Sequence, residues 1–173
     1  MATLRIDLDG SGNPVRTLWD QLSRVPGGRT LFSLLVGRAA RYTGTIRAKV
    51  VTLERGRSEV LMKDRPSVRN HLRSVHAVAL ANLVELTGNI AMAYTMPDDA
   101  RFIVAGMTVD YVKKARGPIT GRCSCPVPDS AARVEYAVPV TLHDADGDVV
   151  VRATLRTLVG PKRERGADSH ERA

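Results

Sequence analysis

The apolar residues of the chain concentrate in the stretch 75–93, where Glu85 is the only charged residue. This stretch has no polar face as wide as that of a surface helix, so it predicts a helix buried in the core. A lone carboxylate inside such a helix costs several kcal/mol unless it is paired, protonated or used in chemistry. Asn82, Glu85, Gly88 and Asn89 interrupt the run, which argues against a membrane span.

Outside this helix, apolar residues follow a helical spacing near the N-terminus and a strand-like alternation elsewhere. Spacings of three and four predict one helix from Asn13-Pro14 and a second over 30–42, ending at Gly44. Alternation with a period of two then predicts a hairpin of strands 45–55 and 58–64 around a Gly56-Arg57 turn. The same alternation predicts four later strands, the last two joined by an Asp-Gly turn within 144–148. They span 101–114, 119–126, 133–143 and 149–159.

This order of elements predicts an α+β fold, with an antiparallel sheet wrapped around the long buried helix. The chain of 173 residues is long enough for one such domain. We expect an N-terminal helical extension over 1–43, the sheet-and-helix domain over 44–160, and a disordered tail over 161–173, which is polar and aperiodic.

The composition indicates a globular protein and argues against several functional classes. Apolar residues at 43% and charged residues at 25% are ordinary for a globular protein, and aromatics at 4% argue against base stacking and hence against nucleic-acid binding. The N-terminus has no apolar segment of the signal-peptide type, so a cytoplasmic location is expected. Cys123 and Cys125 stand two apart in a predicted strand, which suits half-buried free thiols better than a disulfide or a metal site. No metal or cofactor is predicted.

The net charge of +8 is uneven along the chain. Residues 29–73 carry eleven Lys and Arg against three Asp and Glu, and residues 101–122 carry five against one. Such segments indicate either an anionic partner or a solvated basic surface, and charge alone leaves both open.

Polar residues mark two places on the buried helix. Asn82, Glu85 and Asn89 are three and four apart, so they form one narrow stripe. The two asparagines could simply hydrogen-bond Glu85, or the carboxylate could be chemically active. At the other end, Ser74 is the predicted N-cap, which would leave the N–H groups of residues 75–77 free to bind a negative oxygen.

These residues resemble a known family. Asn70, His76-Ala77 and Glu85, in a helix between two strands and four, resemble the motif of the hotdog-fold acyl-CoA thioesterases, in a branch related to the phenylacetate-pathway thioesterases. The resemblance covers about residues 44–160. The family usually has His-Gly-Gly where this chain has His76-Ala77-Val78; alanine keeps the backbone donor but not the space that glycine leaves.

The resemblance implies a role for each residue. Glu85 would be the general base or nucleophile, the Ala77 N–H the oxyanion donor, and His76 a support for the loop. Asn70 would lie near the thioester or the attacking water, and Asn89 would align water or carboxylate. Asn82 is a candidate contact to the substrate. Three cations next to the Gly117-Pro118 junction are candidates for the phosphates of coenzyme A (CoA). They are Lys113, Lys114 and Arg116.

One geometric consequence does not depend on the family. Ala77 and Glu85 are eight residues apart, which separates them by about 12 Å along a helix. They cannot act on one carbonyl, so a site that uses both needs two subunits, and we expect a homodimer or a dimer of dimers.

Alternatives remain at this stage. The substrate could be acyl-CoA or a carrier-protein thioester. A non-catalytic acyl-CoA-binding hotdog protein fits the same residues, because fold does not fix function. A hydratase or dehydratase is less well supported, since its His-Phe-Pro loop is absent and residues 71–73 read His-Leu-Arg.

Overall fold

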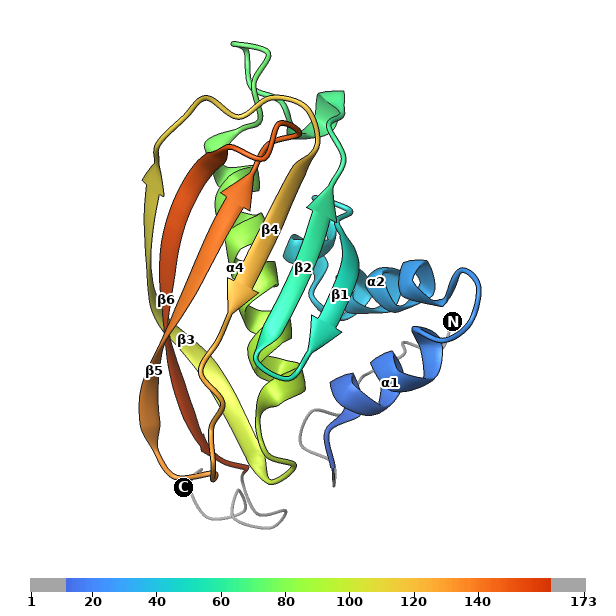
Figure 1. Cartoon of the computed structure of the whole chain (residues 1–173), viewed down its shortest axis with the longest axis vertical. Helices are drawn as coiled ribbons and strands as arrows, with labels where there is room; N and C mark the ends of the chain where they lie inside the picture. Colours follow the sequence, from blue (N-terminus) through green and yellow to red (C-terminus); the bar gives the residue numbers. More distant parts are fainter. Residues whose placement is uncertain (1–11, 163–173) are drawn as a thin grey trace, which may run out of the picture.

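The computed structural model describes residues 12–162, which form an antiparallel sheet curled around one long helix, with shorter helices at one side (Figure 1). The predicted α+β class is therefore confirmed. Residues 1–11 and 163–173, and with them most of the predicted tail, lie outside the described residues. In chain order the elements are α1 (Pro14–Leu22), α2 (Gly28–Ala39), α3 (Arg41–Gly44), β1 (Lys49–Glu54), β2 (Arg57–Met62), the 3₁₀ turn η1 (Pro66–Val68), α4 (Ala77–Thr95), β3 (Ala100–Tyr111), β4 (Ile119–Ser124), β5 (Val134–His143) and β6 (Val149–Pro161).

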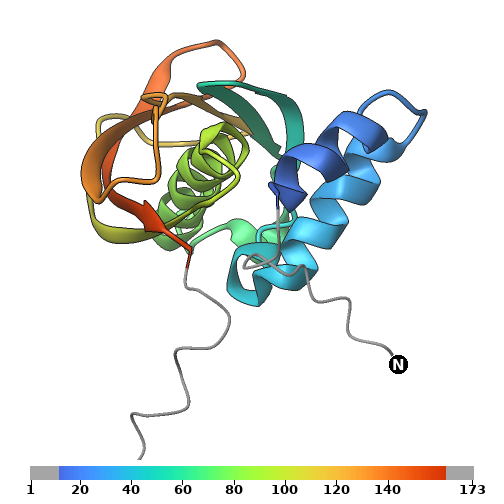
Figure 2. The same ribbon diagram turned by 90° about the horizontal axis from the view of Figure 1, so that it is seen from below.

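The sheet has six strands in the order β1-β2-β4-β5-β6-β3, with every neighbouring pair antiparallel. Strands β1 and β3 are therefore its edges. Seen from below, the sheet curves around α4 and leaves one side of the helix without a strand (Figure 2). This open side of α4 matters for the functional site.

The core lies between α4 and the concave face of the sheet. Leu83 and Met92 of α4 are fully buried, as are Leu142 and Leu155 of β5 and β6. Helix and sheet approach closely at Gly121, where an added Cβ would lie 2.3 Å from the Thr87 Oγ1. A larger residue in this strand position would push the helix away.

Hydrogen bonds, one buried and one partly buried, fix α4 along the first hairpin. The Ser58 hydroxyl donates to the Thr87 carbonyl at 2.7 Å, and the Gly56 N–H donates to the Thr95 Oγ1 at 2.8 Å. Since buried polar groups need partners, a shift of the helix by even one residue would break both bonds. These two bonds fix the position of α4 relative to the first hairpin.

The N-terminal helices pack beside β1 and the end of α4. Asn13 caps α1 by accepting from the Arg16 N–H, and its Nδ2 donates to the Ala93 carbonyl at 2.7 Å. Trp19 of α1 meets Phe32 of α2 edge to face at 5.0 Å between ring centroids. The predicted second helix is interrupted at Ala40, where the backbone leaves helical geometry, so that it becomes α2 and α3.

Three details differ from the prediction. The first hairpin turns at Arg55-Gly56 rather than Gly56-Arg57, because Gly56 has φ +77°, which glycine adopts at little cost. Cys123 and Cys125 are free as expected but buried rather than half-buried. Helix α4 is long and apolar enough, by length and hydropathy alone, to cross a membrane, but it is mostly buried as the core of this fold.

Candidate functional site

The N-terminus of α4 differs from the prediction. The helix begins at Ala77, and His76 rather than Ser74 is its N-cap, because the Nδ1 of His76 accepts from the Val78 N–H at 3.1 Å. Ser74 is buried before the helix, and its hydroxyl lies 3.2 Å from the Asn70 Oδ1. The imidazole therefore does the capping that the sequence assigned to the serine.

Two of the three predicted free N–H groups are already used. The Val75 N–H donates to the Ala115 carbonyl at 2.9 Å, and the His76 N–H donates to the Val68 carbonyl at 2.8 Å. The Ala77 N–H has no acceptor within residues 12–162 and lies at the exposed start of the helix. Of the three, Ala77 alone remains free to donate to a ligand.

The open side of α4 carries a stripe of accessible residues. Val78, Ala81, Glu85 and Asn89 are exposed or half-buried, at the spacing of three and four that keeps them on one face. Glu85 makes no hydrogen bond or ion pair within the described residues. The hydrogen bonds to Glu85 that the sequence allowed from the two asparagines are not formed, so this carboxylate is available.

The asparagines next to Glu85 have unused acceptor atoms. Asn82 is 5% exposed and donates through Nδ2 to the Tyr42 carbonyl at 3.2 Å, but its Oδ1 is buried without a partner in the described structure. The Oδ1 of Asn89 is likewise buried and without a partner there. Buried carboxamide oxygens are normally satisfied, so water or a bound ligand is the expected donor.

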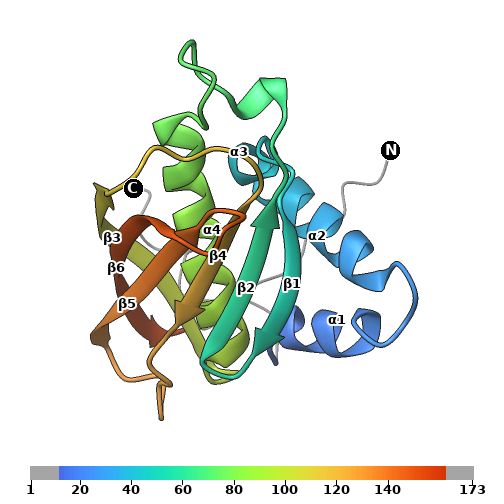
Figure 3. The same ribbon diagram turned by 45° about the horizontal axis from the view of Figure 1, so that its top comes forward.

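Asn70 organises the loop that leads into α4 (Figure 3). Its Oδ1 accepts from the N–H groups of Leu72 and Ser74 at 2.9 and 3.2 Å. The loop is also tied by Arg69, which forms two hydrogen bonds of 2.8 and 2.9 Å with the carboxylate of Asp64. Asn70 thus shapes the segment before the helix, and its oxygen is already occupied.

The three cations predicted to bind the CoA phosphates differ in whether they have acidic partners. Lys113 is ion-paired with Asp144 at 2.9 Å and with Asp148 at 2.5 Å, and these carboxylates raise its pKa. Lys114 and Arg116 are exposed and have no ion pair within the described chain. Lys113 is also charged, but its charge is already paired with two carboxylates, so of the three only Lys114 and Arg116 have, within the described chain, an uncompensated charge to offer a ligand.

Strand β3 borders the open side of α4 and exposes apolar residues there. Met107 pairs in register with the buried Leu155, and Tyr111 pairs with the buried Val151, so both point to the concave face. They are nevertheless 40% and 49% exposed. The Tyr111 hydroxyl donates to the Ala77 carbonyl at 3.1 Å, which places this strand beside the helix start.

This apolar border was not predictable from the sequence. Alternation along β3 predicts an inward face, but only the strand order shows that β3 is an edge that α4 does not fully cover. A cleft beside α2, described below, was missed for a similar reason. In the sequence, the basic residues of this cleft appear only as part of the excess of positive charge over residues 29–73.

The sheet order and central helix are those of a hotdog fold, as the resemblance implied, and solved structures agree. A probable thioesterase from Pseudomonas aeruginosa, itself of unknown function, is 20% identical, with a TM-score of 0.68 over 79% of this chain and 97% of that one. A hypothetical thioesterase from Streptococcus pneumoniae, solved with coenzyme A, is 16% identical, with a TM-score of 0.59 over 74% and 99%.

The chain belongs to the family described as a domain of unknown function, DUF4442, whose model matches residues 28–159. The match begins with α2, so the family domain includes part of the predicted N-terminal extension. A crystal structure of a structural-genomics target is 30% identical, with a TM-score of 0.72 over 85% of this chain and 97% of that one. A comparison with curated proteins finds no match.

Proposed function

We propose that this protein is a thioester hydrolase that converts an acyl-CoA, or an acyl carrier-protein thioester, to the free acid and a thiol. The observation that carries the proposal is Glu85 on the open side of α4, without an ion pair or hydrogen bond in the described part of the chain, one turn from the Asn89 Oδ1, which has no partner there either. A carboxylate and an acceptor without partners are suited to hold and deprotonate a water molecule.

The proposed chemistry uses Glu85 and Ala77, from two copies of this chain, and water. With Glu85 as general base, a water oxygen attacks the thioester carbonyl carbon while the carboxylate takes the proton. The carbonyl oxygen becomes negative and accepts from the Ala77 N–H. The C–S bond then breaks, and the thiolate leaves with the proton. With Glu85 as nucleophile, its carboxylate attacks the carbonyl carbon, the C–S bond breaks and the thiolate leaves, which gives an acyl-glutamate anhydride; water then cleaves the anhydride to the free acid and the Glu85 carboxylate, and one proton from water passes to the thiolate.

A dimer follows from the separation of these groups. Ala77 and Glu85 of one chain are about 12 Å apart along α4, too far for one carbonyl. A second subunit packed on the open side of α4 would bring its Ala77 toward Glu85 of the first. It would also cover Val78, Met107 and Tyr111, which are exposed apolar residues along this side. We propose a homodimer, alone or as half of a tetramer.

The comparisons support this reading at the level of fold. Two similar structures carry the name thioesterase, and one of these was solved with coenzyme A. For this chain the substrate remains part of the proposal, as do the roles of His76, Asn70 and Asn82 near the reacting groups. We propose that Lys114 and Arg116 contact the substrate phosphates. Lys113 is not proposed as a contact, because it is already ion-paired with Asp144 and Asp148. A cytoplasmic location is also proposed.

The test is release of free thiol from a panel of acyl-CoA substrates by the purified protein. Glu85→Gln is nearly isosteric and should lower turnover by at least about 100-fold, the usual effect of losing an acid-base group. The control is Glu54→Gln at the exposed end of β1, which should keep wild-type turnover.

The alternatives give different results in the same assay. A non-catalytic protein would bind acyl-CoA without releasing thiol, and a hydratase would change an enoyl-CoA without releasing thiol. Wild-type turnover in a folded Glu85→Gln variant would remove this carboxylate from the mechanism.

A further inference from the structure

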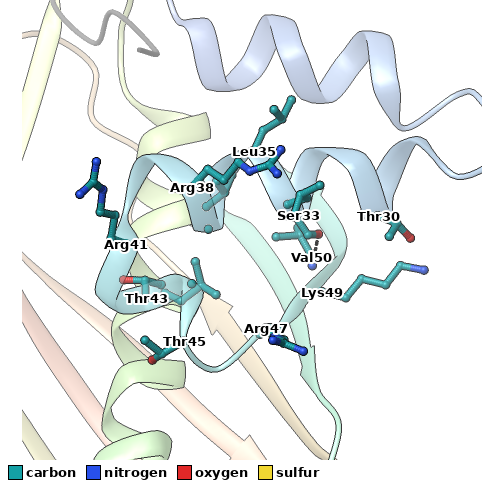
Figure 4. A pocket seen from close by; sticks show the side chains of 16 residues that line it. Thr30, Ser33, Leu35, Arg38, Arg41, Thr43, Thr45, Arg47, Lys49 and Val50 are labelled. Carbon is teal, nitrogen blue, oxygen red and sulfur yellow. Dashed lines mark hydrogen bonds between the residues drawn. The ribbon is translucent and has the colours of Figure 1, made fainter. Parts of the chain in front are cut away.

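A second candidate site lies outside the helix stripe. A cleft of about 990 Å³ opens between α2, α3 and the start of β1 (Figure 4). Its apolar lining comes mostly from α2 and β1, with one residue from the central helix. These residues are Leu34, Leu35, Val36, Ala48, Val50 and Leu86.

The walls of this cleft are held in place. The Ser33 hydroxyl of α2 accepts from the Val50 N–H of β1 at 2.9 Å, which fixes the helix to the strand. At the other end α3 folds tightly onto α2, and a Cβ added at Gly44 would lie 2.2 Å from the Gly37 carbonyl oxygen. The cleft is thus part of the folded framework.

The charged lining of the cleft is entirely basic. Arg38 and Arg41 come from α2 and α3, and Arg47 and Lys49 come from the segment that enters β1 (Figure 4). No aspartate or glutamate lines the cleft, and none of the four cations has an ion pair within residues 12–162. Elsewhere in the described chain, several cations do have acidic partners. These are Arg16, Arg69, Lys113, Arg122 and Arg156.

A fifth cation adds to this positive field. Arg65 donates to the carbonyl of Thr45, which lines the cleft, at 3.0 Å. Burial, and then the charge of nearby Arg47, lower the pKa of Arg65. Cations that repel one another without a counter-charge are stabilised by a bound anion.

We propose that this cleft is a binding site for a phosphate ester with at least two negative charges and an apolar portion. Guanidinium groups bind phosphate oxygens through paired hydrogen bonds, and the cleft offers three of them. A single carboxylate would leave most of the positive charge uncompensated. Leu34, Leu86 and the other apolar residues contact the uncharged part, and the volume is that of a small-molecule pocket.

Two sources can supply this chemistry: the nucleotide end of a coenzyme thioester, or a phosphorylated single-chain lipid. The first source rests on the proposed thioesterase function, whereas the second does not. A nucleic acid fits poorly, because no aromatic residue lines the cleft for base stacking.

The experiment measures binding without any thioester, so its result is independent of catalysis. Calorimetric titrations of the full-length protein use adenosine 3′,5′-bisphosphate in one arm and a lysophosphatidate below its micellar concentration in the other. The variant is Arg38→Ala/Arg47→Gly. Arg47 has φ +45°, which glycine adopts readily, so its backbone should be retained. Circular dichroism and thermal melting verify folding.

The matched control is Arg122→Ala/Arg156→Ala, which removes the same charge from two exposed arginines of the sheet that have acidic partners. At least one probe should bind the wild type, more weakly at high salt. The cleft variant should bind that probe at least about 10-fold more weakly, as expected for two lost charge-assisted bonds, and the control should bind it within about twofold.

The probe that binds identifies the source of the phosphate. Absence of binding by both probes overturns the proposal, and so does an equal loss in cleft and control variants. If the first variant does not fold, Arg41→Gln/Lys49→Gln replaces it with the same expected loss.

Discussion

His76 and Val78 are joined by a hydrogen bond of 3.1 Å, in which the backbone N–H of Val78 donates to Nδ1 of the imidazole. Nδ1 must therefore be unprotonated, and the ring satisfies one of the free donors at the start of α4. This bond places His76 at the helix terminus as a cap and leaves the neighbouring Ala77 N–H for a ligand.

The cap can be tested by replacement. His76→Ala should lower the free energy of unfolding by about 0.5–2 kcal/mol, the usual loss for an N-cap. His76→Asn should retain most of this stability, because asparagine is a strong N-cap residue. Urea denaturation measures both. Equal destabilisation by alanine and asparagine would show that the cap is not what His76 contributes.

The intersubunit site predicts complementation between two inactive variants. Glu85→Ala removes the carboxylate. Ala77→Pro removes only the backbone donor, since position 77 is the first of the helix and His76 already has the extended backbone that precedes proline. A mixed dimer then has one intact composite site and one empty one. Its thiol release should reach up to about half of the wild-type value. Verified heterodimers without activity above either parent would reject the shared site.

The open side of α4 predicts the dimer interface. Met107→Glu places a charge on the concave face of the edge strand β3, where the second subunit is expected to pack, and should shift the protein to monomers in light scattering. Leu158→Glu is the control, because Leu158 is also 40% exposed but pairs with Ile103 on the convex face. A Met107→Glu protein that stays dimeric would place the interface elsewhere.

Because helix α4 and the sheet lie close together at Gly121, we expect a larger residue at this position to destabilise the fold. Gly121→Ala should destabilise the fold by about 1–3 kcal/mol, because its Cβ would meet a buried Thr87 hydroxyl whose rotamer is fixed by a 2.6 Å bond to the Leu83 carbonyl. Gly106→Ala, in β3, should be tolerated, since the nearest atom to its Cβ is a flexible arginine end at 3.6 Å. Thermal denaturation of both variants compares the two sites.

The loop before α4 should loosen in acid. The hydrogen bonds from Arg69 lower the pKa of Asp64, so the stability this carboxylate contributes is present above its unfolded pKa and is lost as the pH falls through its folded pKa. Asp64→Asn should therefore reduce stability at pH 7, and the difference from wild type should shrink below about pH 4. Asp129→Asn, at an exposed loop position, is the control in urea titrations. A pH-independent difference would exclude the ion pair as its cause.

The sequence by itself determined most of the helix and strand segments and the central role of α4, because local periodicity and turn chemistry dominate there. The run around Glu85 has too few polar positions for a surface helix, and the alternation along the strands matches a half-covered sheet. The stripe of Glu85 and Asn89 was also predictable, since helical spacing alone places residues four apart on one face.

Tertiary structure decided which of these groups remain free. The sequence predicted Ser74 as the cap of α4, and the contacts of Ser74 with Asn70, and of the His76 N–H with Val68, made His76 the cap instead. The basic residues near 113 and those over 38–49 look alike along the chain. The turn at 144–148 brings two carboxylates to Lys113, whereas α2 folds onto β1 and gathers Arg38 and Arg47 in a cleft that no acidic residue of the described chain lines. Pairing of charges depends on distances between segments far apart in sequence, which periodicity does not encode.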